Sequence, residues 1–253
     1  MDLQLERFGP KITNTCRLSG AANAYLNNVL CINLDVATER LAKLEKELEV
    51  QWVNWHRLQA FDTHQDDAPH GAPGSNVWDQ PGHIGVARSH RECIRYAKHF
   101  DWPHVTIFED DVKFNGDLQE QFAKYIDYVP ADWDFLFLGG IRHLAAPIYV
   151  NEHVVKTTQT FGMIAYIVNH TLYDELIDRW SDEGITTATG EKSSTEISMH
   201  PIQREKNFYA IYPSLVWQDR FNYSYIARSS ELGDITDNIG NFIKQDESGA
   251  LIK

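Results

Sequence analysis

The sequence has few cysteines and few basic residues for its length. Its three cysteines, Cys16, Cys31 and Cys93, form no CxxC pair in 253 residues, so neither a disulfide framework nor a cysteine zinc site is indicated. The 23 lysines and arginines stand against 36 aspartates and glutamates, which gives a net charge of −13. This charge argues against a nucleic-acid backbone or an anionic membrane surface as the main partner. A local basic pocket could still hold a phosphate.

Long apolar runs are also missing. No window approaches the 18 apolar residues typical of a transmembrane helix, and residues 1–10 are charged rather than apolar. We therefore expect a cytoplasmic protein without a membrane span. Hydrophobic residues make up 43% of the chain, enough to bury a substantial core, so a disordered or fibrous protein is excluded.

What the sequence does contain is an alternation of short apolar segments with helical patterns. Strands are predicted at residues 29–34, 53–58, 104–108, 133–138, 163–168 and 208–212. Helices are predicted around residues 41–48, 85–100, 118–129, 172–180 and 196–206, with Asp35 as the cap of the first. This order predicts an α/β fold with a mixed, mostly parallel sheet and helices on both faces.

The chain divides into three segments by pattern. Residues 1–28 lack periodicity and are predicted to be an appendage or an edge element. Residues 29–218 form the α/β domain, interrupted by a long loop at 64–81 that is rich in Gly, Pro, Asp and His. Residues 219–253 lose the apolar rhythm and are predicted to form a loosely packed tail.

The predicted strand at 104–108 runs directly into three acids, Glu109, Asp110 and Asp111. Enzymes with α/β folds bind ligands at the carboxyl ends of their strands. Adjacent carboxylates repel one another unless a cation lies between them, and Mg²⁺ or Mn²⁺ prefers oxygen ligands of this kind. The alternative is a solvated acidic turn without function.

Several further motifs occur in a fixed order around these acids. They are the strand Val29–Asp35 followed by Arg40, the tripeptide Ala60–Asp62, the helix start Gly82–His90, the strand end Ile107–Asp111, the pairs Trp133–Asp134 and Leu138–Gly139, and the strand Ala165–Val168. This series resembles glycosyltransferase family 25, the bacterial lipopolysaccharide glycosyltransferases and their collagen β-galactosyltransferase relatives. The resemblance runs from about Val29 to Trp217.

The resemblance implies a GT-A-like fold and an inverting transfer of a hexose, galactose or glucose, from a UDP-sugar to a hydroxyl of a glycan such as lipopolysaccharide. It implies Mn²⁺ (or Mg²⁺) as cofactor. By the D-x-D pattern of such enzymes, Asp111 binds the metal directly, Glu109 assists through the ribose or a metal-bound water, and Asp110 orients the pair. The implied partners are a nucleotide sugar and a glycan or glycolipid acceptor, and a glycolipid would bring the chain to a membrane surface.

Five more residues match positions of the donor site in the family: Arg40, Asp62, Ser89, His90 and Gln218. A guanidinium at Arg40 would hold a phosphate, although an arginine on a helix surface also pairs with acids of its own helix. Asp62 would approach the uracil or ribose, or simply occupy a turn. Ser89 and His90 lie in the first turns of a helix and would bond donor oxygens, whereas a histidine on an apolar helix face is otherwise a core residue.

An inverting transfer also needs a base for the proton of the acceptor hydroxyl. Relatives commonly offer an aspartate in the segment that corresponds to residues 194–200, and this chain has none there. Glu196 and His200 are the candidates, and His200 is alternatively a metal ligand.

The missing aspartate leaves a second function open, a non-catalytic protein that binds nucleotide sugars or carbohydrates on the same fold. A sugar nucleotidyltransferase is disfavoured because residues 35–40, directly after the first strand, lack the glycines of a phosphate loop. A phosphatase of the D-x-D-x-T type is disfavoured because the second acid after Asp35 is absent.

Overall fold

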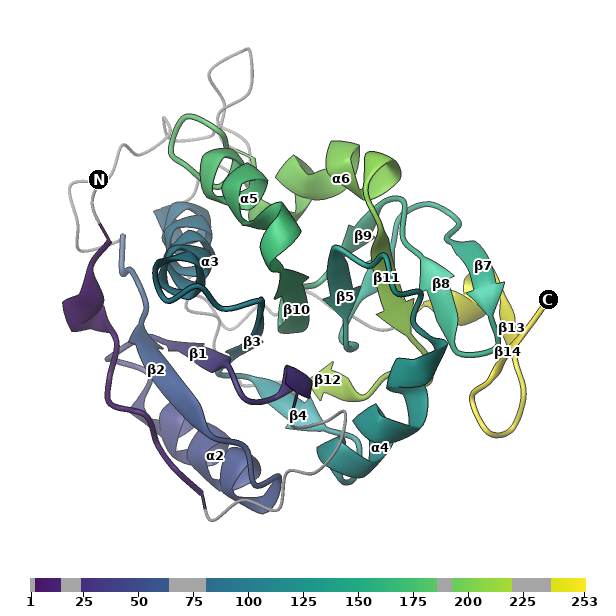
Figure 1. The fold of residues 1–253 in the computed structure, drawn as a ribbon, viewed down its shortest axis with the longest axis horizontal. Coiled ribbons are helices and arrows are strands. Elements are labelled where there is room, and N and C mark those ends of the chain that lie inside the picture. Colours follow the sequence, from purple (N-terminus) through teal and green to yellow (C-terminus); the bar gives the residue numbers. More distant parts are fainter. Residues whose placement is uncertain (1–2, 15–23, 64–80, 186–192, 220–237) are drawn as a thin grey trace.

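The chain folds around one central sheet of eight strands, in the order β2-β1-β3-β10-β5-β11-β8-β7 (Figure 1). The structure, a computed structural model, describes residues 3–14, 24–63, 81–185, 193–219 and 238–253. The strands of the sheet are β1 (Val29–Asn33), β2 (Trp55–Gln59), β3 (His104–Glu109), β5 (Phe135–Phe137), β7 (Ile148–Asn151), β8 (Val154–Lys156), β10 (Ala165–Asn169) and β11 (Phe208–Ile211).

Most strands of this sheet point the same way. Strand β1 pairs in parallel with β2 and β3, and β5 pairs in parallel with β11. Strand β10 is antiparallel to β3 and β5, and β8 is antiparallel to β11 and β7. Strands β10 and β8 therefore run against the other six, and the predicted mixed, mostly parallel sheet is confirmed.

Helices cover both faces of the sheet, as predicted. Helices α3, α5 and α6 lie on one face and α2 and α4 on the other (Figure 1). The helices are α2 (Thr38–Val50), α3 (Pro81–His99), α4 (Leu118–Tyr125), α5 (Tyr173–Arg179) and α6 (Thr195–Glu205), with short 3-10 turns η1 (Leu5–Arg7), η3 (Ile126–Tyr128), η4 (His170–Leu172) and η5 (Ile239–Asn241). No helix of the described ranges is long and apolar enough to cross a membrane.

Strand side chains alternate between two hydrophobic clusters, one under each helical layer. In β3, Val105 and Ile107 join the cluster that contains Ile94 of α3, whereas Phe108 joins the cluster that contains Leu44 of α2. Both sides of the strand are buried, which explains why the sequence reads as a continuous apolar run.

Three two-stranded ladders complete the fold. They are β4 (Val112–Phe114) with β12 (Val216–Gln218), β6 (Arg142–His143) with β9 (Thr160–Phe161), and β13 (Lys244–Gln245) with β14 (Leu251–Ile252). The first matters for the site, because it lays the segment after Pro213 beside the turn that follows β3.

The predicted cap at Asp35 is wrong. Helix α2 begins at Thr38 after Ala37, which provides no side-chain cap. Asp35 instead accepts hydrogen bonds from Arg57 Nη2 and Gln59 Nε2, each at 2.6 Å. The chain turns over residues 35–36 before the helix begins, so the carboxylate faces the end of β2 rather than the first turn of α2.

Both ends of the chain contact the main core. In residues 238–253, Ile239 and Leu251 are only 2% and 3% exposed and belong to the main core, and the loosely packed tail over residues 219–253 stays a prediction. Two apolar residues twelve positions apart have no periodic pattern that reveals their burial. At the other end, Phe8 and Ile12 form bridges to β2. The division of the chain at residues 28 and 218 stays a prediction, and most of the predicted 64–81 loop lies outside the described residues.

Candidate functional site

The acid triplet lies at the carboxyl end of β3, and its side chains diverge. Glu109 is the last residue of the strand and Asp110 begins the turn to β4. Successive side chains of a strand point to opposite faces, so Glu109 faces α3, where its Oε1 lies 2.9 Å from His90 Nε2. Asp110 faces α2, where its Oδ1 accepts from Arg40 Nη1 at 2.9 Å. The two acids therefore serve opposite sides of the sheet edge.

Asp110 is held by a polar network on the α2 side. Its Oδ2 accepts from Asn33 Nδ2 at 2.7 Å, and Asn33 Oδ1 in turn accepts from Arg57 Nε at 3.0 Å. Burial raises the pKa of Asp110, and the neighbouring Arg40 guanidinium opposes that rise. Arg40 thus supplies one of the cations that three adjacent acids require.

Asp111 differs from its two neighbours in its hydrogen bonding. Its side chain is 7% exposed, and its Oδ2 accepts from Gln218 Nε2 at 2.9 Å and lies 3.6 Å from Arg40 Nη1. Its Oδ1 is buried without a hydrogen-bond partner among the described residues. Burial, together with the charges of Glu109 and Asp110, raises the pKa of Asp111 to about 8. A buried acceptor in this condition favours the approach of a cation.

A pocket of about 270 Å³ opens beside Asp111. Its wall is made by Lys43, Leu44, Lys46, Glu47, Asp110, Asp111, Val112, Lys113 and Asp219. Three lysines face four carboxylates, which leaves a formal charge of −1 that one divalent cation would turn positive. Gln218 reaches Asp111 because it pairs with Val112 in the β4–β12 ladder.

A second polar group lies on the α3 side of the same edge. The buried His90 ring bonds the Tyr166 hydroxyl at 2.6 Å through Nδ1 and Glu109 through Nε2. Glu196 lies at the start of α6, where burial raises its pKa, the charge of Glu109 raises it further, and His90 opposes the rise. Two carboxylates and an imidazole therefore lie within electrostatic range of one another, and perturbed pKa values of this kind cluster at functional sites.

The sequence profile described as glycosyltransferase family 25 (LPS biosynthesis protein) matches residues 26–189, more than half of the chain. The match includes the acid triplet, Arg40 and His90. The chain belongs to glycosyltransferase family 25. Glu196, His200 and Gln218 lie beyond the matched range. The comparison with curated proteins found no match.

This glycosyltransferase is also distantly similar to solved structures. One is a glycosyltransferase involved in glycosylation of the major capsid of PBCV-1, with 9% identity, a TM-score of 0.41, and 73% of this chain and 92% of that chain covered. Another is A197 from STIV, with 10% identity, a TM-score of 0.38, and 77% and 95% covered. A third is apo UDP-glucose pyrophosphorylase, with 9% identity, a TM-score of 0.37, and 80% and 77% covered.

The remaining predicted site residues of the glycosyltransferase differ in where they lie. Ser89 is 1% exposed, donates to Gly85 O at 2.7 Å and accepts from Phe61 N at 3.0 Å. Its one proton is therefore used inside the fold, and the predicted contact with a donor is not supported. Gly85 allows this packing, because a Cβ there would lie 2.4 Å from Phe61 O. Asp62 follows Phe61 beyond the end of β2 and is partly buried.

The two candidate bases of the glycosyltransferase lie in different surroundings. The His200 ring packs edge-on against Phe161 of β9, with centroids 5.2 Å apart, and burial lowers its pKa. No contact among the described residues joins His200 to the acid triplet. Glu196 instead feels the charges of Glu109 and His90, so of the two it is the one placed near the triplet.

Sequence reasoning missed three kinds of residue at this site. Asn33 anchors Asp110, and its signal is a polar side chain at the end of an otherwise apolar strand. Tyr166 holds His90 through its hydroxyl, but a tyrosine in a buried strand reads as core. The pocket lysines, Lys43, Lys46 and Lys113, are assembled from α2 and β4, and nothing in the sequence links them.

The Arg40–Asp110 pair leads to a prediction of stability. Both side chains are largely buried, at 13% and 11% exposure. Arg40→Gln leaves a buried carboxylate without its cation, so we expect the free energy of unfolding to fall by about 3 kcal/mol. Adding Asp110→Asn should recover most of that loss, because the unpaired charge is then gone. Urea unfolding of the two single variants and the double variant at pH 7 measures the coupling; additive losses would contradict it.

Proposed function

We propose that this chain transfers a hexose, galactose or glucose, from a UDP-sugar to a hydroxyl of a glycan such as lipopolysaccharide, with inversion at the anomeric carbon. In this proposal Mn²⁺ or Mg²⁺ binds at Asp111 and the domain works as a GT-A transferase in the cytoplasm. The observation that carries the proposal is the buried Asp111 Oδ1, which has no hydrogen-bond partner within the described part of the chain and lies beside a pocket with three lysines.

The residues present fit a divalent cation of this type. The described residues contain no group of three or more His, Cys, Asp or Glu side chains placed to hold a metal. Mg²⁺ and Mn²⁺ bind to one or two carboxylates and complete their shell with water and substrate phosphates. Asp111 would be the direct ligand and Glu109 a second contact through water. The bound cation would neutralise charge that develops on the leaving diphosphate.

The chain's own side chains would do the rest of the work on the α2 side. Lys43, Lys46 and Lys113 line the pocket and would attract the diphosphate in a protein whose overall charge repels anions. Gln218 donates to Asp111 Oδ2 and would keep that carboxylate oriented. Arg40 holds Asp110 and so fixes the turn that carries Asp111.

On the α3 side, Glu196 would act as the general base. The acceptor oxygen forms its bond to the anomeric carbon as the bond from that carbon to the phosphate oxygen breaks. The hydroxyl proton passes to the Glu196 carboxylate, whose raised pKa makes it a stronger base than an ordinary glutamate. His90, held by Tyr166, would keep Glu109 in place at the edge of the sheet.

A donor panel tests the proposal. With Mn²⁺, UDP-galactose or UDP-glucose near a hundredfold of its dissociation constant should raise the melting temperature by about 5 °C, since binding adds about 2.7 kcal/mol. GDP- and CMP-sugars are expected to give smaller shifts. Release of UDP with lipopolysaccharide core oligosaccharide should accompany the shift. No shift with any donor would overturn donor binding, and a shift without product would favour the non-catalytic alternative.

A further inference from the structure

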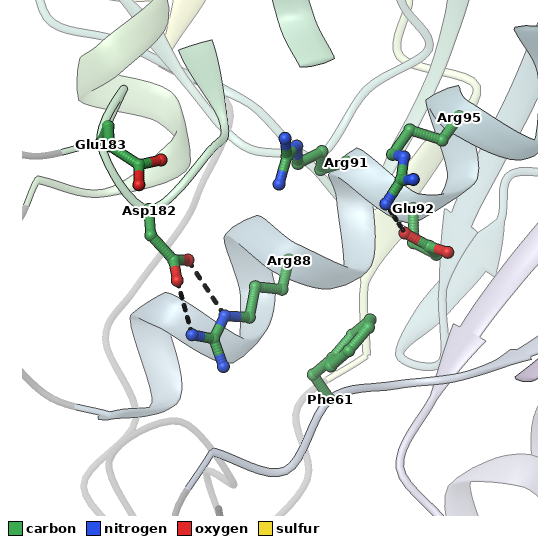
Figure 2. A pocket seen from close by; sticks show the side chains of 7 residues that line it. All are labelled: Phe61, Arg88, Arg91, Glu92, Arg95, Asp182 and Glu183. Carbon is green, nitrogen blue, oxygen red and sulfur yellow. Dashed lines mark hydrogen bonds and ion pairs between the residues drawn. The ribbon is translucent and has the colours of Figure 1, made fainter. Parts of the chain in front are cut away.

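A second pocket of about 270 Å³ lies on the outer face of α3, and its wall carries three arginines (Figure 2). Its lining residues are Phe61, Arg88, Arg91, Glu92, Arg95, Asp182 and Glu183. The arginines recur at spacings of three and four residues and so share one side of the helix. His90, on the same helix, points to the core, where it bonds Tyr166 and Glu109. In a chain with a net charge of −13, composition alone would not lead one to expect such a concentration of arginine.

Two of these arginines are engaged with acids and one is not. Arg88 makes a two-pronged ion pair with Asp182, at 3.0 and 2.6 Å, and Arg95 Nη1 donates to Glu92 Oε2 at 3.1 Å. Arg91 donates from Nε to the carbonyl of Ile177 at 2.8 Å, and none of the acids within the described ranges pairs with it. Figure 2 shows no dashed line from the Arg91 guanidinium to a labelled acid.

The three lining arginines are matched by three lining acids, and a neighbouring arginine makes the surroundings positive. Glu92 is 3% exposed, and its Oε1 already accepts from the backbone N of Gln4 at 2.5 Å. Arg7 stacks 3.8 Å above the Phe61 ring and adds a fourth guanidinium behind the pocket. Four arginines against Glu92, Asp182 and Glu183 leave a formal charge of +1. A guanidinium with both Nη groups available matches the two oxygens of a phosphate.

We propose that this pocket binds a phosphate group carried by the acceptor glycan. The inference rests on the proposed function and names the chemistry of its acceptor. The donor diphosphate has its own place at Asp111, on the α2 side of the sheet edge. Asp182 and Glu183 lie two and three residues after Trp180, whose ring lies 5.9 Å from the His90 ring. The pocket thus shares helix α3 with His90, on the side of the sheet where Glu109 and Glu196 would receive the acceptor.

Inorganic phosphate is the first probe, titrated calorimetrically against the full chain. Arg91→Gln should weaken phosphate binding about tenfold, as expected for a lost charged hydrogen bond. Lys124→Gln removes the same charge from an exposed position on α4 and should leave binding unchanged. Glu183→Gln removes an exposed carboxylate from the rim and should strengthen binding. Equal affinity in wild type and Arg91→Gln, or no phosphate binding by wild type, would overturn the proposal.

The second probe is lipopolysaccharide core oligosaccharide, used before and after chemical removal of its phosphate groups. With UDP-hexose and Mn²⁺, removal should raise the acceptor KM of the wild type about tenfold, with little change in kcat. Arg91→Gln should show one KM for both forms and keep its donor-dependent rise in melting temperature. A wild-type KM indifferent to the phosphates would overturn the acceptor assignment. Absence of any donor shift would count against the proposed function alone, because the phosphate titration reads the pocket independently.

Discussion

Replacing Asp111 by asparagine should lower turnover with a UDP-hexose and Mn²⁺ by about a thousandfold. The variant keeps the size of the side chain and can still accept from Gln218, but it loses the charge that would hold a divalent cation. Such a cation contributes several kcal/mol to transition-state stabilisation, and each 1.36 kcal/mol corresponds to a factor of ten in rate. The Mn²⁺-dependent part of the donor-induced melting shift should vanish as well. Asp127→Asn, at an exposed position on η3, is the matched control.

In the absence of metal, the same variant should become more stable relative to the wild type as the pH rises. The pKa of Asp111 is raised from 3.8 to about 8 in the folded protein, so the native state binds the proton more tightly than the unfolded chain. The free energy of unfolding of the wild type therefore falls between about pH 4 and pH 8, by at most about 1.4 kcal/mol per pH unit. Asparagine removes this dependence. Melting curves at pH 5 and pH 8 should show that the melting temperature of the variant, relative to that of the wild type, is higher at pH 8 than at pH 5. A parallel decline in both proteins would mean that Asp111 is ionised throughout.

Much of the fold was predictable because its core follows simple periods. The strands β1, β3, β5, β10 and β11 each supply residues to both core clusters, and in sequence they read as short apolar runs between helical patterns. The order of these runs also placed Glu109, Asp110 and Asp111 at a strand end. Strand geometry then decides that Glu109 and Asp110 face opposite sides, a step that the pattern of three acids does not reveal by itself.

What escaped prediction depends on contacts between distant segments. The bond from Gln218 to Asp111 joins residues 107 positions apart and forms only because β12 pairs with β4. Asp35 had the right residue type for a helix cap, yet the ends of β1 and β2 lie side by side and bring Arg57 and Gln59 to it. Ile239 and Leu251 are buried without any local apolar pattern. In each case a tertiary contact outweighed the local preference.

Glu196→Gln should lower turnover by about a hundredfold to ten-thousandfold, the usual contribution of a general base. The donor should still bind, with an unchanged shift in melting temperature, because Glu196 lies on the α3 side and the diphosphate pocket on the α2 side. Glutamine keeps the shape of the side chain, so stability at pH 7 should change little. Glu205→Gln, at an exposed position on the same helix, should retain full activity.

His200→Gln separates the two candidate bases. Its ring packs against Phe161 rather than near the triplet, so we expect turnover to fall only a few-fold, with no change in the pH profile. The Glu196→Gln variant should instead lose the acidic limb of the profile of kcat/KM, which in the wild type reports the pKa of the base in the free enzyme. That limb should lie above the pH expected for an ordinary glutamate, because burial and the charge of Glu109 both raise the pKa of Glu196. An acidic limb that persists in Glu196→Gln and disappears in His200→Gln would assign the proton transfer to the imidazole, and the geometry around Glu109 would then serve binding alone.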